Sequence, residues 1–230
     1  MEYQGKEVAA TMVIKINGDI ISNDWKPVYD FFEIESTCPA DISGAISALS
    51  EGEKLEVKIN SGGGDAIAGQ EIYTLLRECP DVEIEIQSIA ASAASIIAMA
   101  GHCSISPVGM IMIHCVSTGA WGNHKALEKE ADTLRQWDAA LATAYCEKTG
   151  KPKDEVIRMM DKETWLTADR ALELGFVDEI SVPAEAKAAA VGNFRVTPDM
   201  MRQYQEAMNA KAEREAEKQK LLNELANYGR

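Results

Sequence analysis

The stretch that most constrains this chain is residues 88–101 (SIAASAASIIAMAG), where serines sit among alanines at the start of an apolar run. Small side chains allow a sharp turn from a strand into a helix, and the N–H groups that begin a helix favour negative charge. A serine at that turn, Ser92, could act as a nucleophile whose developing oxyanion those groups stabilise. Taken alone, the stretch fits an ordinary buried helix with two incidental hydroxyls at least as well.

Length and charge exclude several classes of protein. The chain has 230 residues, enough for one domain of good size plus an appendage, and its formal net charge is −14. Nucleic-acid affinity comes mainly from Lys and Arg, so this charge disfavours nucleic-acid binding. The longest uncharged apolar run, 89–101, is shorter than the roughly 18 residues of a membrane span, and residues 1–18 lack a signal-peptide pattern. We expect a cytoplasmic protein that binds neither nucleic acid nor membrane.

The cysteines and the glycine-rich turn do not fit the motifs of disulfide frameworks, zinc sites or nucleotide-binding loops. The five cysteines are odd in number and have no CxxC spacing, so neither a disulfide framework nor a zinc site is expected. The turn at residues 60–65 (NSGGGD) lacks the Lys and Ser/Thr of a phosphate loop and the GxGxxG spacing of a dinucleotide turn. We therefore predict no metal and no cofactor.

Strand and helix patterns alternate along most of the chain. Apolar alternation predicts strands at residues 12–16, 55–59, 82–86, 103–106 and 110–114. Helical spacing predicts helices at 66–76 and 92–100, and Asp41 is expected to cap a helix over 42–49. Strands that alternate with helices indicate right-handed crossovers and a mostly parallel sheet. The fold class is therefore α/β.

The second half is dominated by one long helix, residues 124–148, with an apolar stripe that includes Leu127, Leu134 and Leu141. Part of this stripe could contact another subunit, or the helix could pack wholly within its own domain. Further helices are expected at 153–160 and from a Thr167 cap, and 176–180 closes the domain. We place the domain at residues 1–182 and a charged helical tail at 183–230, which is rich in Ala, Lys and Glu.

A serine nucleophile needs a base, and histidine is the side chain whose pKa lies nearest neutral pH. His114 ends a strong strand pattern, which places it at the rim of the sheet where α/β proteins assemble their sites. His102 follows a predicted helix end and His124 begins the long helix, so both are weaker candidates. We predict that His114 is the general base.

The third catalytic group should be a carboxylate that orients the imidazole. Asp161 and Glu163 both precede Trp165, an aromatic residue that could shield the pair from water, and spacing does not decide between them. The oxyanion would be received by backbone N–H groups. Gly64, in the glycine turn, and Ala93, directly after the nucleophile, are the candidates.

Four ordered blocks resemble a known family. VKINSGGGDAIAG, IAASAASIIAMAG, MIMIH and ETWLTADRALELGFVDEI resemble the proteolytic subunits of Clp proteases, and most closely their phage relatives, the head maturation (prohead) proteases. The resemblance covers residues 12–180. It implies that Ser92 is the nucleophile, His114 the base, Glu163 the acid with Asp161 as the alternative, and Gly64 and Ala93 the oxyanion donors. Clp subunits commonly have proline at the position of Gly62, Ser-Met-Gly at 92–94 and aspartate at that of Glu163.

The resemblance also implies an architecture and partners. The fold would be a ClpP/crotonase-like spiral of βα units with a long handle helix, assembled into homo-oligomeric rings of six or seven subunits or into double rings. Residues 115–121 would pair with an extended polypeptide substrate. The sequence contains no Walker motif, so any ATP dependence would come from a partner.

Several functional interpretations remain open at this stage. The first is a serine endopeptidase that cleaves phage scaffold, portal or coat protein in the bacterial host cytoplasm, within an assembling prohead. The alternatives are a host-type Clp proteolytic subunit that works with an unfoldase, and a catalytically silent oligomeric assembly module. A crotonase-like acyl-CoA enzyme is a third alternative, which the Ser–His pair disfavours.

Overall fold

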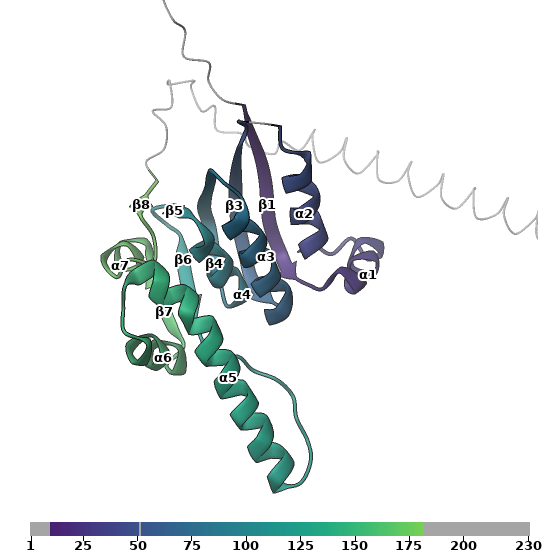
Figure 1. Ribbon diagram of the computed structural model, residues 1–230, viewed down its shortest axis with the longest axis vertical. Helices are drawn as coiled ribbons and strands as arrows, with labels where there is room; N and C mark the ends of the chain where they lie inside the picture. Colours follow the sequence, from purple (N-terminus) through teal and green to yellow (C-terminus); the bar gives the residue numbers. More distant parts are fainter. Residues whose placement is uncertain (1–9, 51, 182–230) are drawn as a thin grey trace, which may run out of the picture. The chain divides into compact units, whose positions relative to one another are not determined.

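Alternating apolar residues build the centre of a parallel sheet (Figure 1). The computed structural model describes residues 10–50 and 52–181. In β3 (Lys54–Gly64), Leu55, Val57 and Ile59 are fully buried, whereas the side chains between them are partly or fully exposed. β1 (Thr11–Ile20) and β4 (Val82–Ala91) flank β3 on either side in parallel register. One face of the sheet therefore meets the core, as the period-two pattern predicts.

The sheet order is β2-β1-β3-β4-β5-β8. Its outer strands are β2 (Ser36–Thr37), β5 (His102–Ile105) and β8 (Glu179–Ile180). β6 (Met110–Ile113) runs parallel to the last residues of β4 and pairs antiparallel with β7 (Thr164–Thr167). β4 thus pairs with β5 along its first half and with β6 at its end. The expected α/β fold with a mostly parallel sheet and a long helix is confirmed.

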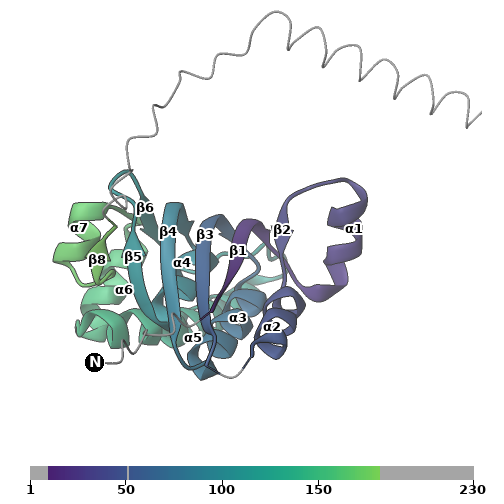
Figure 2. The same cartoon turned by 90° about the horizontal axis from the view of Figure 1, so that it is seen from above.

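Helices cover the buried face of the sheet. Figure 2 shows α2 (Pro39–Ala48), α3 (Ala66–Glu78) and α5 (His124–Thr149) on the same side of the strands. α6 (Lys153–Asp161) and α7 (Ala168–Glu173) lie near β7 and β8, and α1 (Lys26–Phe31) lies beyond β2 at the other edge. Thr167 caps α7 as predicted, since its side chain accepts a hydrogen bond from the Arg170 N–H.

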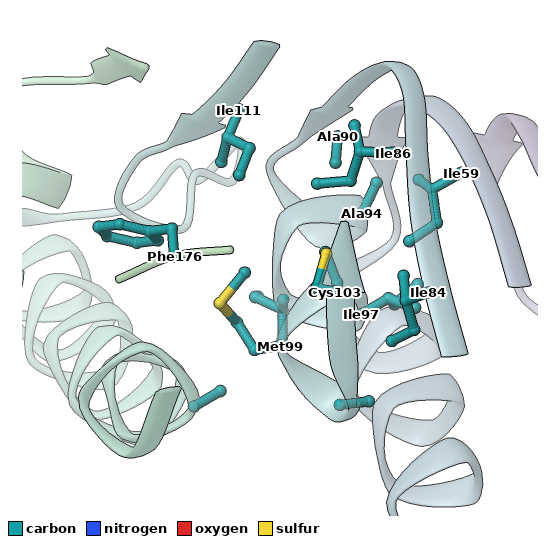
Figure 3. Packing of buried hydrophobic residues seen from close by; sticks show 14 of the residues in the cluster. Ile59, Ile84, Ile86, Ala90, Ala94, Ile97, Met99, Cys103, Ile111 and Phe176 are labelled. Carbon is teal, nitrogen blue, oxygen red and sulfur yellow. The ribbon is translucent and has the colours of Figure 1, made fainter. Parts of the chain in front are cut away.

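The core is centred on the short helix α4 (Ala93–Ile97), which continues into the 3-10 turn η2 (Ala98–Ala100). Every residue of both segments is buried. Figure 3 shows Ala94 and Ile97 packed against Ile84 and Ile86 of β4. Because α4 is enclosed on all sides, the residue that starts it is held in a fixed position.

Some elements differ from expectation. Cys38, rather than Asp41, is the N-cap of α2; Asp41 is the third helical residue, and its carboxylate accepts the Cys38 N–H at 2.9 Å. The short elements α1, β2, β7 and the 3-10 turn η1 (Asn23–Trp25) were not predicted. The tail expected at 183–230 lies outside the described residues. Among those described, no helix is both long and apolar enough to cross a membrane, and no cluster of side chains is suited to a metal ion.

The long helix α5 has two distinct halves. Leu141 and Tyr145, in its second half, are buried, whereas Leu127, in the first half, is 43% exposed. Figure 1 shows this first half extending beyond the sheet, with the preceding loop beside it. Residues 10–50 and 52–181 therefore cover only part of the apolar stripe.

An ion pair fastens the buried half of α5 to the sheet. Lys148 donates to the Gly101 carbonyl at 2.8 Å and forms a salt bridge with Asp178, which also accepts the Cys103 N–H at 2.7 Å. Burial raises the pKa of Asp178, but the hydrogen bonds from Lys148 and Cys103 outweigh burial, so the net pKa lies below its ordinary value of 3.8. The ionised carboxylate therefore stabilises the fold.

We predict that Asp178→Asn lowers the free energy of unfolding at pH 7. A lowered pKa in the folded state gives stability that is present above pH 3.8 and is lost as the pH falls through the folded pKa. The difference between wild type and variant should therefore shrink below pH 3.8, as measured by urea unfolding from pH 7 to pH 3. Asp24→Asn, at an exposed position, is the control. A constant difference across this range would contradict the prediction.

Candidate active site

Ser92 occupies a strained turn between β4 and α4. Its φ and ψ are 53° and −124°, a backbone region that residues other than glycine rarely adopt. Two hydrogen bonds hold the turn: the Ser92 N–H donates to the Met112 carbonyl at 2.9 Å, and the Ser92 carbonyl accepts the Ser95 N–H at 2.9 Å. A serine on such a strand-to-helix turn projects its hydroxyl away from the sheet, as nucleophilic serines of other α/β enzymes do.

Close backbone approach explains the small residues around this turn. A Cβ on Gly63 would lie 2.7 Å from the Ser92 Cβ, and one on Gly69 of α3 would lie 2.9 Å from the Ala93 Cβ. Gly63 also has φ of 101°, and its N–H donates to the Ser61 hydroxyl at 3.1 Å. The glycine turn and the serine turn are therefore packed directly against each other.

The structure brings Ser92 and His114 together. His114 follows the last residue of β6, and its Nε2 lies 2.7 Å from the Ser92 Oγ. With the ring proton on Nδ1, Nε2 accepts the hydroxyl proton, which is the geometry that a general base requires. His102 instead contacts the Glu83 carboxylate at 2.8 Å, and His124 is the first residue of α5. Of the predicted bases, the structure places His114 beside the serine.

Neither predicted acid hydrogen-bonds to His114. The Asp161 Oδ1 accepts the Cys115 thiol at 3.3 Å, and the Glu163 Oε1 accepts the Trp165 indole N–H at 3.2 Å. Burial, followed by the hydrogen bond to Asp161, raises the pKa of Cys115 to about 12, so this thiol stays protonated and keeps Asp161 engaged. Within residues 10–50 and 52–181, no carboxylate lies within 4 Å of a His114 ring nitrogen.

Strand register nevertheless distinguishes the two acids. β6 and β7 pair antiparallel with Ile113 opposite Thr164. The pairing ends there: His114 directly follows β6, and Glu163 directly precedes β7 with a left-handed φ of 49°. Asp161 lies two residues farther along, at the end of α6. Of the two acids, Glu163 is therefore the nearer along the chain to the strand pair beside His114.

The predicted oxyanion donors line the same cleft as the Ser–His pair. This cleft has a volume of about 250 Å³ and is lined by Gly64 and Ala93 beside Ser92 and His114. Gly64 has φ of 146°, and a Cβ there would lie 2.1 Å from the Ile20 carbonyl oxygen, so only glycine fits. Ala93 is the first residue of α4, where an N–H has no intrahelical partner. Ile96, Leu141 and Tyr145 add an apolar wall.

The buried side chain of Ser95 holds the turn at Ser92 by a hydrogen bond. It is completely buried; its hydroxyl donates to the Ser92 carbonyl at 2.6 Å and lies 2.7 Å from the Tyr145 hydroxyl. The Ser95 hydroxyl has one proton, which it donates to the Ser92 carbonyl. The Tyr145 O–H is therefore the donor in the bond between the two hydroxyls. Burial raises the pKa of Tyr145, which keeps this donor protonated. Tyr145 lies four residues after Leu141 on the predicted long helix, and nothing in this spacing indicated the hydrogen bond to Ser95.

Comparison with known proteins yields one family and several relatives. The model of the Clp protease family matches residues 32–184. The chain is 31% identical over 141 residues to the ATP-dependent Clp protease proteolytic subunit of Bacteroides fragilis, which covers 60% of this chain and 68% of that protein. It is 32% identical over 139 residues to the ATP-dependent Clp protease proteolytic subunit 1 of Streptomyces avermitilis, with 59% and 64% covered. The match to the Porphyromonas gingivalis subunit is 31% over 139 residues and spans 63% of that protein.

We predict that Ser95→Ala weakens the fold but spares the reactive hydroxyl. The change leaves the buried Tyr145 hydroxyl and the Ser92 carbonyl each short of one partner, which should cost about 1–3 kcal/mol of unfolding free energy. Labelling by a fluorophosphonate should persist in Ser95→Ala and in the exposed control Ser88→Ala, and should vanish in Ser92→Ala. Labelling that survives Ser92→Ala and disappears in Ser95→Ala would identify Ser95 as the nucleophile.

Proposed function

Because the chain belongs to the Clp protease family, we propose that it is a serine peptidase in which Ser92 is the nucleophile and His114 the general base. The observation that carries the proposal is the 2.7 Å contact between the Ser92 Oγ and the His114 Nε2. Two residues that are 22 positions apart meet at a strained turn, beside a glycine turn that also lines the cleft. A buried structural helix does not require this arrangement.

The geometry supports acyl transfer in two halves. His114 removes the hydroxyl proton as the Ser92 Oγ attacks the peptide carbonyl carbon, and the oxyanion is stabilised by the N–H groups of Gly64 and Ala93. The imidazolium then gives its proton to the leaving amine, and an acyl-serine remains. Water, deprotonated by His114, attacks this ester and releases the acid, which restores the serine hydroxyl.

Glu163 is the carboxylate that we propose as the partner of His114. Glu163 directly precedes Thr164, which pairs with the residue before His114, whereas Asp161 accepts the hydrogen bond of the Cys115 thiol. To accept a hydrogen bond from the His114 Nδ1, the Glu163 carboxylate gives up its hydrogen bond from the Trp165 indole N–H. Its backbone, with φ of 49°, lies in the left-handed region, which makes this position a turn at the edge of the strand.

A polypeptide substrate suits the cleft. An extended peptide can pair with the irregular segment after His114 by main-chain hydrogen bonds, which gives broad tolerance of side chains. The wall of Ile96, Leu141 and Tyr145 then accepts one apolar side chain next to the scissile bond. The part of the stripe that the described residues leave exposed, on the first half of α5, fits a contact with a second subunit in a ring.

The relatives favour one biological setting over another. Those named above are proteolytic subunits of ATP-dependent Clp protease, so we propose a subunit of this kind whose ATPase activity belongs to a partner. The head maturation role expected from the AASAAS and ETW blocks has no support from these relatives. Phage scaffold, portal and coat proteins therefore remain a prediction from the sequence alone.

We predict that both Ser92→Ala and His114→Ala lose at least about three orders of magnitude in kcat/KM on a fluorogenic peptide, because each removes an essential part of one catalytic unit. Fluorophosphonate labelling should vanish in Ser92→Ala and slow by a comparable factor in His114→Ala. His102→Ala, which changes a histidine far from the serine, is the matched control. A wild-type oligomer that is folded but never labelled would indicate a silent assembly module.

The two acids should separate in their effects. Glu163→Gln removes the charge that would support the imidazolium, and we expect a loss in kcat of about a hundredfold or more at pH 7. Asp161→Asn removes only a partner of the Cys115 thiol and should change kcat by less than about threefold. Equal and mild losses in both variants, measured on the same peptide, would show that neither carboxylate orients His114.

A further inference from the structure

The chain leaves the sheet directly after Ile113, the residue before His114. β6 ends at Ile113, and residues 114–121 have no regular secondary structure. Val116 and Ser117, in this segment, line the cleft together with Ser92 and His114. The segment is therefore the part of the cleft wall whose position the sheet does not determine.

One main-chain hydrogen bond joins the segment to α5. The Val116 N–H donates to the Asp138 Oδ1 at 2.7 Å. In the described chain, no other main-chain N–H of residues 115–122 forms a hydrogen bond. Asp138 lies one helical turn before Leu141, which belongs to the apolar wall of the same cleft. The Asp138 carboxylate therefore joins the segment after His114 to the helix that carries part of this wall. A bond from a backbone N–H to a carboxylate is charge-assisted and stronger than a neutral one.

We propose that Asp138 is a positioning residue, which fixes the register in which a substrate peptide pairs with residues 115–117; this inference rests on the proposed function. In an extended chain, the N–H and C=O groups of successive residues point to opposite sides. The Val116 N–H points to α5. When a peptide adds as a strand to residues 115–117 and holds them extended, the main-chain groups of Cys115 and Ser117 are directed to the opposite side and pair with the peptide.

The catalytic pair does not depend on this bond. β6 pairs with β4 as far as Met112 and with β7 as far as Ile113, and the Met112 carbonyl accepts the Ser92 N–H at 2.9 Å. These contacts hold His114 beside Ser92 from the sheet side. Loss of the Asp138 bond should therefore weaken the binding of an extended peptide and leave the reactivity of the serine intact.

Three substitutions separate position from charge. Asp138→Asn keeps an oxygen acceptor in place without charge, Asp138→Glu keeps the charge but displaces the oxygen by one methylene, and Asp138→Ala removes both. We expect KM for a peptide of about ten residues to stay within twofold in the Asn variant, to rise severalfold in the Glu variant and to rise about tenfold in the Ala variant. The rate of fluorophosphonate labelling should stay within twofold in all three. Asp132→Ala is the control, an exposed aspartate on the same helix.

Each other result would overturn the inference. If KM is unchanged in the Ala and Glu variants, the bond has no role in peptide binding. If the Glu variant resembles wild type while the Asn variant resembles Ala, Asp138 acts through its charge. If labelling slows together with peptide turnover, Asp138 acts on the catalytic pair. If wild type is not labelled at all, the proposed function fails, and this inference fails with it.

Discussion

The turn at Ser92 is the constraint on which the rest of the site depends. A non-glycine residue held at φ of 53° costs of order 1–3 kcal/mol, and it persists only where the surroundings over-determine it. Here β4 is paired with β3, β5 and β6, and α4 is buried on every side. The strand before Ser92 and the helix after it are thus both held by their neighbours. The serine between them therefore has little conformational freedom.

The same constraint explains the composition around the turn and the polar atoms beneath it. Gly63 and Gly69 lie so close to Ser92 and Ala93 that a Cβ would clash, which accounts for the run of small residues. Ser95 and Tyr145 supply a hydrogen-bonded support inside an otherwise apolar core. Buried polar groups are costly unless they are paired, and this pair is satisfied through the carbonyl of the strained residue.

The sequence predicted what depends on local periodicity. The strand at 55–59 and the helix at 66–76 follow from apolar spacing, and His114 was expected at the rim of the sheet because it ends a strand pattern. β7 was missed, since four residues after an acidic turn carry little pattern, and its antiparallel register with β6 is a long-range pairing. Asp138 could not be singled out from the sequence, because the long helix carries many charged residues with similar spacing. Only the contact with the Val116 N–H distinguishes it.

Three carboxylates on the elements around His114 have three different hydrogen-bond partners, which are set by the element that carries each carboxylate. Asp161, at the end of α6, contacts a thiol whose raised pKa keeps it a donor. Glu163, in the turn before β7, accepts the Trp165 indole N–H. Asp138, on α5, meets the main chain one residue past Cys115. A carboxylate that holds backbone needs an oxygen in the right place, whereas one that supports an imidazolium needs its charge. The elements that carry these three carboxylates thus give each a different hydrogen-bond partner, which is why we propose a different role for each.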